Sequence, residues 1–330
     1  MMNFCTLFDS YYLHKGIALY LSLEHVTCDF HLYVMSFDKE SYGKLTALGF
    51  KHMTVELVDD FESPELLAVK PSRSKGEYCW TCGPSVIYHF LTKNNLDEIT
   101  YLDADLFFLT DPKTIFEEIG SSSVAITEQG IDEKTANTYG RYCVQYMTFR
   151  KDQEGIEALT WWRDRCIEWC YARIEDNRFG DQKYLDEFPK RWKNIYVVKN
   201  LGVGIAPWNM HRYQYTDDHL SFRGITYPFV FFHMHGVQVD VESTKLTLKS
   251  KDAQLSEACV RLFYQPYAEL LKHVLNTYMG YHIDSIDIQD MSQLKVWEYK
   301  LRSMVRNNKM VRWLYYSLLK KSSKGHGTKL

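Results

Sequence analysis

The feature that most constrains the fold is the alternation of short apolar runs with amphipathic segments over the first hundred residues. Short apolar runs suit buried strands, and amphipathic stretches between them suit helices that cover a sheet. The alternation predicts β-α-β units around a mostly parallel sheet. The segments concerned are Asn3–Phe8, Tyr12–Leu23, His31–Phe37, Tyr42–Leu48 and Met53–Val58.

The middle of the chain continues this pattern. A helix is predicted over Tyr78–Leu91, beginning near Pro84 because proline is tolerated in a first helical turn. A short buried strand, Ile99–Leu102, comes next. The later elements that we expect are strands at Val124–Thr127, Tyr142–Phe149, Ile195–Val198 and Phe229–His233, a Trp-rich helix at Glu154–Tyr171, and a short helix at Asp181–Phe188 closed by Pro189.

Length and charge narrow the class of protein. The 330 residues can bury one large α/β core or two smaller ones. A formal charge of −3 gives no general electrostatic reason to bind nucleic acid, so a small ligand is favoured. No run of about eighteen apolar residues occurs, and the N-terminus lacks a basic segment followed by an apolar one. We therefore expect a cytoplasmic protein without a nucleic-acid partner.

Two acidic residues, Asp103 and Asp105, directly follow the strand Ile99–Leu102. In extended geometry both carboxylates share a face and can bind one cation together. Their oxygens are hard ligands that suit magnesium or manganese. A solvated loop or a helix cap is the alternative for any Asp-X-Asp pair. The apolar residues on both sides favour a buried setting, in which acids need a partner.

At these residues the sequence resembles a known family. The segment Tyr101–Asp105 is similar to the Tyr-Leu-Asp-X-Asp signature of GT-A glycosyltransferases, especially the retaining family that includes glycogenin and bacterial lipooligosaccharide galactosyltransferases. Other segments agree in order over about residues 3 to 240. They are Phe4–Asp9 with Ala18–Leu23 as a nucleotide-binding strand and helix, Gly180–Gln182, and His233–Gly236 as a His-X-X-Gly segment.

The resemblance implies a GT-A fold, which is a Rossmann-like mixed sheet flanked by helices. We expect this transferase domain over residues 1–254, and a C-terminal helical extension with a basic tail over residues 255–330.

The resemblance also implies roles for individual residues. Asp103, Asp105 and His233 would bind Mn²⁺ or Mg²⁺, and Asp103 would also lie near the ribose. The remaining residues with implied roles are Thr6, Asp9 and Tyr11 for the uracil and ribose, and Asp181 and Gln182 beside the reacting anomeric carbon.

Some of these assignments have alternatives in the sequence itself. His233 and His235 alternate along a strand end, so one of them at most faces the metal in regular geometry; we favour His233. Asp181 could instead cap the helix that it begins. Two family features are absent: Val237–Val239 follows Gly236 without the family's lysine, and Cys143–Gln145 stands where an Asn-X-Gly segment is expected.

The function that these features predict is transfer of a hexose from a nucleotide-diphosphate sugar, a UDP-sugar by preference, to a hydroxyl of a glycan or lipid-linked saccharide. Retention of configuration follows from the resemblance only; an inverting enzyme would need a carboxylate base, for which Asp181 or Asp218 could serve. A catalytically silent GT-A scaffold that binds nucleotide-sugar or glycan is one alternative. A metal-dependent nucleotidyltransferase is another.

The C-terminal region combines an apolar stripe from Leu294 to Leu319 with many cations. A basic amphipathic helix can lie in a membrane interface, here the inner face of a membrane that carries a lipid-linked acceptor. The alternative, which we favour slightly, is a helical hairpin packed on the catalytic domain. The cations are Lys295, Lys300, Arg302, Arg306, Lys309, Arg312, Lys320, Lys321 and Lys324.

Overall fold

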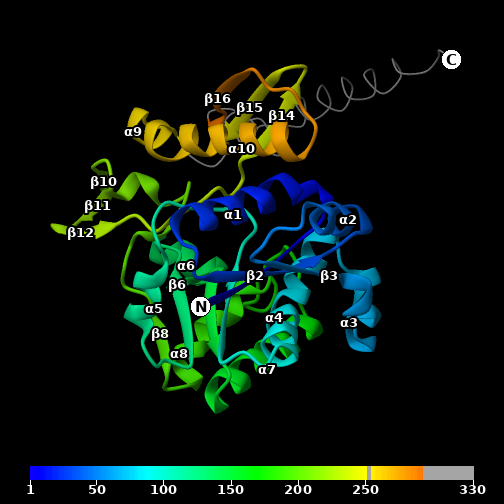
Figure 1. Cartoon of the computed structure of the whole chain (residues 1–330). Coiled ribbons are helices and arrows are strands. Elements are labelled where there is room, and N and C mark those ends of the chain that lie inside the picture. Colours follow the sequence, from blue (N-terminus) through cyan, green and yellow to red (C-terminus); the bar gives the residue numbers. More distant parts are fainter. Residues whose placement is uncertain (251–253, 293–330) are drawn as a thin grey trace, which may run out of the picture.

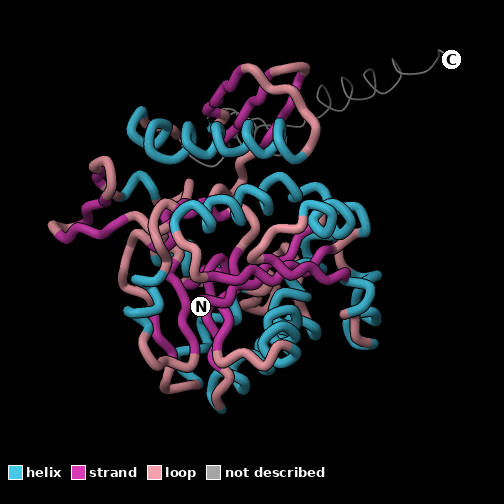
Figure 2. The backbone as a smooth tube through the Cα atoms, in the orientation of Figure 1, coloured by secondary structure: helices cyan, strands magenta, loops and turns pink. Residues whose placement is uncertain are grey.

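A seven-stranded sheet forms the centre of the protein in this computed structural model, which describes residues 1–250 and 254–292 (Figures 1 and 2). Its strand order is β3-β2-β1-β4-β7-β6-β8. The first four strands in this order are parallel, whereas β7 is antiparallel to both of its neighbours. The strands are β1 Met2–Phe8, β2 Phe30–Ser36, β3 Met53–Leu57, β4 Glu98–Leu102, β6 Val124–Glu128, β7 Tyr142–Arg150 and β8 Ile195–Val197.

Helices cover both faces of this sheet, because successive strand residues point to opposite sides. On one side Phe4 and Val34 join a core with α1 and α10; on the other, Cys5 and Met35 join a core with α4 and α7. The predicted mixed sheet flanked by helices is confirmed. The helices are α1 Leu13–Val26, α2 Lys39–Leu48, α3 Pro64–Val69, α4 Lys75–Lys93, α5 Lys113–Ile119, α6 Glu133–Tyr139, α7 Gln153–Glu168, α8 Phe188–Arg191, α9 Glu257–Cys259 and α10 Gln265–Tyr278.

Two predicted helix ends were wrong, and both involve proline. Helix α4 does not begin near Pro84, because a capping box between Ser74 and Glu77 satisfies the backbone N–H groups of an earlier start. Pro84 lies inside the helix. Likewise Pro189 does not close a helix: a 3₁₀ helix runs over Gln182–Glu187, and Pro189 sits in the first turn of α8.

A second, three-stranded sheet was only partly predicted. It has the order β5-β13-β9, with β5 at Leu106–Phe108, β13 at Phe231–His233 and β9 at Val203–Ile205. Strand β13 runs antiparallel to β5 and parallel to β9. Because β5 follows β4 after three residues, this pairing carries the end of β13 to the carboxyl end of β4.

The C-terminal part of the described chain lies over α1, at the top of Figure 1. Helix α10 follows α9 and a π-helical segment, Val260–Tyr264, and packs into the α1 core. The helical expectation beyond Leu255 is confirmed for α10 but was wrong for β16, where isoleucines at alternate positions pair with β15. The remaining strands are β10 Gln214–Tyr215, β11 His219–Phe222, β12 Ile225–Pro228, β14 Gln238–Glu242, β15 Lys245–Ser250 and β16 Ser285–Asp290.

The predicted division after residue 254 stays a prediction; β15 before it and β16 after it belong to one sheet. The stripe from Leu294 to Leu319 lies outside the described residues. Among the residues that are described, none of the helices combines the length and apolar character needed to cross a membrane.

Candidate metal and donor site

Asp103 and Asp105 lie in the tight connection between β4 and β5. The backbone N–H of Asp103 donates to the carbonyl of Gln145 on β7 (3.0 Å), and the N–H of Leu106 donates back to the carbonyl of Asp103 (3.2 Å). The Tyr101 hydroxyl donates to Asp103 Oδ1 at 3.1 Å. The apolar strands on both sides therefore hold the two acids at the carboxyl end of β4, the edge at which open α/β sheets bind ligands.

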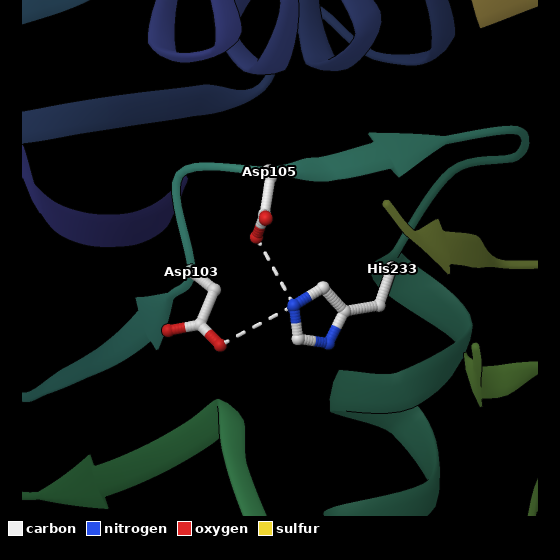
Figure 3. Close-up of side chains that lie close together, drawn as sticks. All are labelled: Asp103, Asp105 and His233. Carbon is white, nitrogen blue, oxygen red and sulfur yellow. Dashed lines mark ion pairs between the residues drawn. The ribbon is translucent and has the colours of Figure 1, made fainter. Parts of the chain in front are cut away.

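His233 reaches these acids from the end of β13. It is paired with Leu106 in the second sheet, and the N–H of Met234 donates to the carbonyl of Asp105 (2.9 Å). Its Nε2 lies 3.0 Å from Asp105 Oδ1 and 3.6 Å from Asp103 Oδ2 (Figure 3). One donor atom from each of the three side chains lies within 4.8 Å of the others. His235 is exposed and is not a member of this group.

The orientation of His233 is set by its second ring nitrogen. Nδ1 lies 2.6 Å from Gln145 Oε1. An amide oxygen only accepts, so Nδ1 carries the hydrogen and Nε2 is directed at the two carboxylates. The Trp208 ring packs edge-on against His233, with centroids 5.4 Å apart. Metal-binding histidines commonly have a hydrogen-bond partner on the second ring nitrogen, as Gln145 is here, and this partner fixes both the tautomer and the direction of the ring.

The buried charges interact strongly. Although burial alone would lower the pKa of His233, the charge of Asp105 and the hydrogen bond to it raise that pKa to about 10. Burial would raise the pKa of Asp105, but His233 and Lys15 hold it well below its usual range. Burial, opposed by His233, and the like charge of Asp105 raise the pKa of Asp103 to about 6. The group is therefore a compact charged cluster, of which only Asp103 is partly open, with 29% of its side chain exposed.

These three residues fit a divalent cation. Two carboxylates and one imidazole are donors that Mn²⁺ accepts readily. Adjacent ligands of an octahedral ion at roughly 2.1 Å lie about 3 Å apart, which is the separation between His233 Nε2 and Asp105 Oδ1. Asp103, the partly exposed member, is the side of the cluster that can be reached from solvent.

Asp181, predicted beside the anomeric carbon, is 8% exposed and starts the 3₁₀ helix. It makes no side-chain capping bond, so the capping alternative is not seen. Burial and the charge of Asp103 raise the pKa of Asp181 to about 7. The indole N–H of Trp162 donates a hydrogen bond to the backbone carbonyl of Asp181 at 2.9 Å. Gln182 instead donates from Nε2 to the carbonyl of Tyr139 (2.8 Å). The structure thus places Asp181 where it feels the charge of Asp103, whereas the side chain of Gln182 is bonded to the backbone of Tyr139.

The residues predicted for the nucleotide lie on and after β1, whose carboxyl end neighbours that of β4. Thr6 is fully buried, and its hydroxyl has no hydrogen-bond partner among the described residues. Asp9 accepts from the N–H of Tyr11 (3.1 Å), and Lys75 lies 3.5 Å from its carboxylate. Tyr11 is 73% exposed. Asp9 and Tyr11 are thus accessible to a ligand at this edge, whereas Thr6 lies below the surface.

Two side chains of the site are not evident from the sequence. Lys15 of α1 is 5% exposed, and its Nζ lies 3.7 Å from Asp105 Oδ2. A lysine in an amphipathic helix gives no sequence signal for burial. Gln145 occurs within a segment compared with an Asn-X-Gly pattern, and only the fold shows that its amide holds His233.

Space for the Gln145 amide depends on Gly204, whose φ is +104° and whose added Cβ would lie 2.5 Å from Gln145 Nε2. We expect Gly204→Ala to destabilise the fold by roughly 2 to 3 kcal/mol, from backbone strain plus displacement of the buried Gln145 amide. Gly224→Ala is the matched control: its φ is +80° but its Cβ would meet open space, so strain alone should cost about 1 kcal/mol. Urea unfolding of both variants measures the difference, and equal losses would show that the collision is relieved.

No protein-family model matches the chain. It is 30% identical over 276 residues to the uncharacterized protein YfnD of Bacillus subtilis (strain 168), covering 82% of this chain and 88% of YfnD. It is 29% identical over 297 residues to the uncharacterized protein YfnF of the same organism, covering 86% of this chain and 94% of YfnF.

Among solved structures, an active-site mutant of LgtC superposes with a TM-score of 0.52 at 12% identity, over 82% of this chain and 95% of LgtC. LgtC is described as a galactosyltransferase in its complex with donor and acceptor sugar analogues. The superposition on LgtC shows a shared fold, whereas the sequence identity to YfnD shows common descent. The chain belongs to the same protein family as YfnD, and it has the GT-A fold of glycosyltransferases such as LgtC.

Proposed function

We propose that the protein is a metal-dependent glycosyltransferase that moves a hexose from a nucleotide-diphosphate sugar, by preference a UDP-sugar, to a hydroxyl of a glycan or lipid-linked saccharide. The observation that carries this proposal is the convergence of Asp103, Asp105 and His233 within 4.8 Å of one another. They lie at the carboxyl edge of the central sheet of a GT-A fold, where Gln145 directs His233.

In this proposal Asp103, Asp105 and His233 hold Mn²⁺ or Mg²⁺. The ion, when bound, neutralises charge on the departing nucleoside diphosphate. Asp103 is the ligand open to the donor, and it also lies near the ribose. Gln145 keeps the proton of His233 on Nδ1, so that Nε2 is free to donate its lone pair to the ion.

The remaining proposed roles concern the donor itself. Thr6, Asp9 and Tyr11 form the uracil and ribose side, with the exposed Tyr11 ring as a stacking surface. Asp181 and Gln182 belong to the sugar side, where the burial of Asp181 beside Asp103 supports a position near the reacting carbon. Retention of configuration rests on the family resemblance alone.

The direct test is to incubate the protein with Mn²⁺ and a panel of nucleotide sugars, with and without saccharide acceptors, and to measure release of the free nucleotide and the mass of the sugar product. Metal-dependent release of one nucleoside diphosphate, with a glycosylated acceptor, would support the proposal. Binding without any turnover would favour a silent scaffold. Exchange of the nucleotidyl group would favour a nucleotidyltransferase.

Asp105→Asn should lower metal-dependent turnover by roughly 100-fold or more, because the amide keeps the volume of the side chain but removes a charge that the cation needs. Thermal unfolding and circular dichroism should show a folded protein. Asp59→Asn, at an exposed position, is the matched control and should retain full activity. Near-normal metal-dependent activity of a folded Asp105→Asn protein would contradict the assignment of the site.

His233→Ala should weaken Mn²⁺ binding more than His235→Ala does, because Nε2 of His233 lies at hydrogen-bond distance from Asp105. A Mn²⁺ titration followed by electron paramagnetic resonance compares the two variants directly. If His235→Ala causes the larger loss, the third ligand is His235.

The basic segment from Lys295 to Lys324 lies outside the described residues. Of its two proposed roles, peripheral contact with the inner, cytoplasmic face of a membrane comes second to packing on the catalytic domain. With the membrane contact, the full-length protein should sediment weakly with anionic vesicles and not with zwitterionic ones. Binding should fall as salt rises, because surface attraction is screened over about 8 Å at physiological ionic strength. A protein that stays in the supernatant at low salt would exclude this contact.

A further inference from the structure

A buried lysine stands beside the acidic cluster. Lys15, in the first turn of α1, is 5% exposed. Its Nζ donates to the carbonyl of Val237 at 3.1 Å and lies over the Tyr12 ring at 4.6 Å from the centroid. Lysine is almost never this buried unless its charge is paired. The buried charge of this ammonium group therefore needs a nearby anion.

The anion within reach is shared with other groups. Asp105 Oδ2 lies 3.7 Å from Lys15 Nζ, which is beyond hydrogen-bond distance, whereas Asp105 Oδ1 lies 3.0 Å from His233 Nε2. Within the described residues, the hydrogen bond from Nζ goes to a neutral carbonyl. Asp105 is thus mainly the partner of His233, and Lys15 is only partly neutralised.

A bound divalent cation would increase this imbalance. Two carboxylates, those of Asp103 and Asp105, neutralise one divalent ion, and His233 would coordinate it without charge. The ammonium of Lys15 then remains as a buried positive charge next to the ion. An anionic ligand that touches both the ion and Lys15 would restore neutrality, and a diphosphate has enough oxygens to do so.

The helix that carries Lys15 adds to this potential. Helix α1 has fourteen residues and directly follows a 3₁₀ turn, Ser10–Tyr12, at whose start Asp9 accepts from the N–H of Tyr11. The N-cap of α1 itself, Tyr12, makes no side-chain capping bond. The N-terminus of a helix of this length bears a partial positive charge that favours phosphate groups. Lys15 sits in that first turn, so its ammonium and the backbone dipoles act in the same direction.

We propose that Lys15 binds the diphosphate of the donor, as a fixed cation beside the metal, and stabilises the nucleoside diphosphate as it departs. This inference rests on the proposed function and names a further binding residue for it. The bond from Nζ to the carbonyl of Val237 holds the side chain in place, since it ties α1 to the segment that directly follows the His233 strand. An ammonium suits this role as a compact point charge.

The test is a comparison of ligands on Lys15→Met, Lys15→Gln and the wild type, by calorimetry. In the presence of Mn²⁺, affinity for UDP should fall roughly 10- to 100-fold in both variants, because one charge-assisted contact is lost. Affinity for uridine should not change. Affinity for Mn²⁺ alone should stay the same or rise, because a cation 3.7 Å from Asp105 has been removed.

A loss of UDP affinity without a loss of Mn²⁺ or uridine affinity separates a binding role from a structural one. A purely structural lysine would weaken Mn²⁺, uridine and UDP together, and that result would overturn the inference. UDP affinity equal to that of the wild type would also overturn it. Lys15→Gln can still donate to the carbonyl of Val237, so it reports on the charge even if Lys15→Met fails to fold.

Two controls accompany these variants. Lys249→Met removes a lysine that pairs with Asp240 on β14, in the C-terminal sheet, and should leave UDP affinity unchanged. A wild type that does not bind UDP in the presence of Mn²⁺ would contradict the proposed function itself, and so is distinguished from a failure that concerns Lys15 alone.

Discussion

The pairing of β13 with β5 is the interaction on which the site depends. It places His233 opposite Leu106 and lets the N–H of Met234 bond to the carbonyl of Asp105, so that the imidazole faces the two acids. If β13 slipped by one residue against β5, its other face, and so a different side chain, would point toward the cluster. The small second sheet therefore determines which histidine can meet the carboxylates.

Next to that strand pair, two uncharged residues, Gln145 and Gly204, determine how the charged side chains are positioned. Gln145 carries no charge, yet its amide oxygen sets the direction in which His233 presents Nε2 to the two carboxylates. Gly204 makes room for the amide through a backbone conformation that residues with a side chain rarely adopt. The charged side chains are buried together, which strengthens every interaction between them relative to water. A ligand that supplies both a cation and an anion, such as the metal-bound diphosphate proposed above, would complement such a cluster.

Much of the fold could be predicted because its signals are local. The strands β1 to β4 and helix α1 follow from apolar periodicity, and the acids after β4 follow from their place between apolar runs. Some errors arose because proline indicates a helix start, whereas the capping box at Ser74 starts the helix earlier. Others arose where strands are short and pair with distant partners. Strands β5, β9 and β16 are of this second kind, since three to six residues carry too little pattern to be recognised alone.

The sequence by itself determined the kinds of chemistry available: an α/β chain, two carboxylates at the end of a buried strand, and a histidine pair near a later strand end. Only the tertiary structure decided how these meet. It selected His233, which bonds to Gln145 from 88 residues away, and it buried Lys15, which reaches a carbonyl 222 residues away. The physical reason is that burial and hydrogen bonding depend on contacts between distant segments. A lysine on a helix has the same sequence pattern whether it faces water or a buried charge.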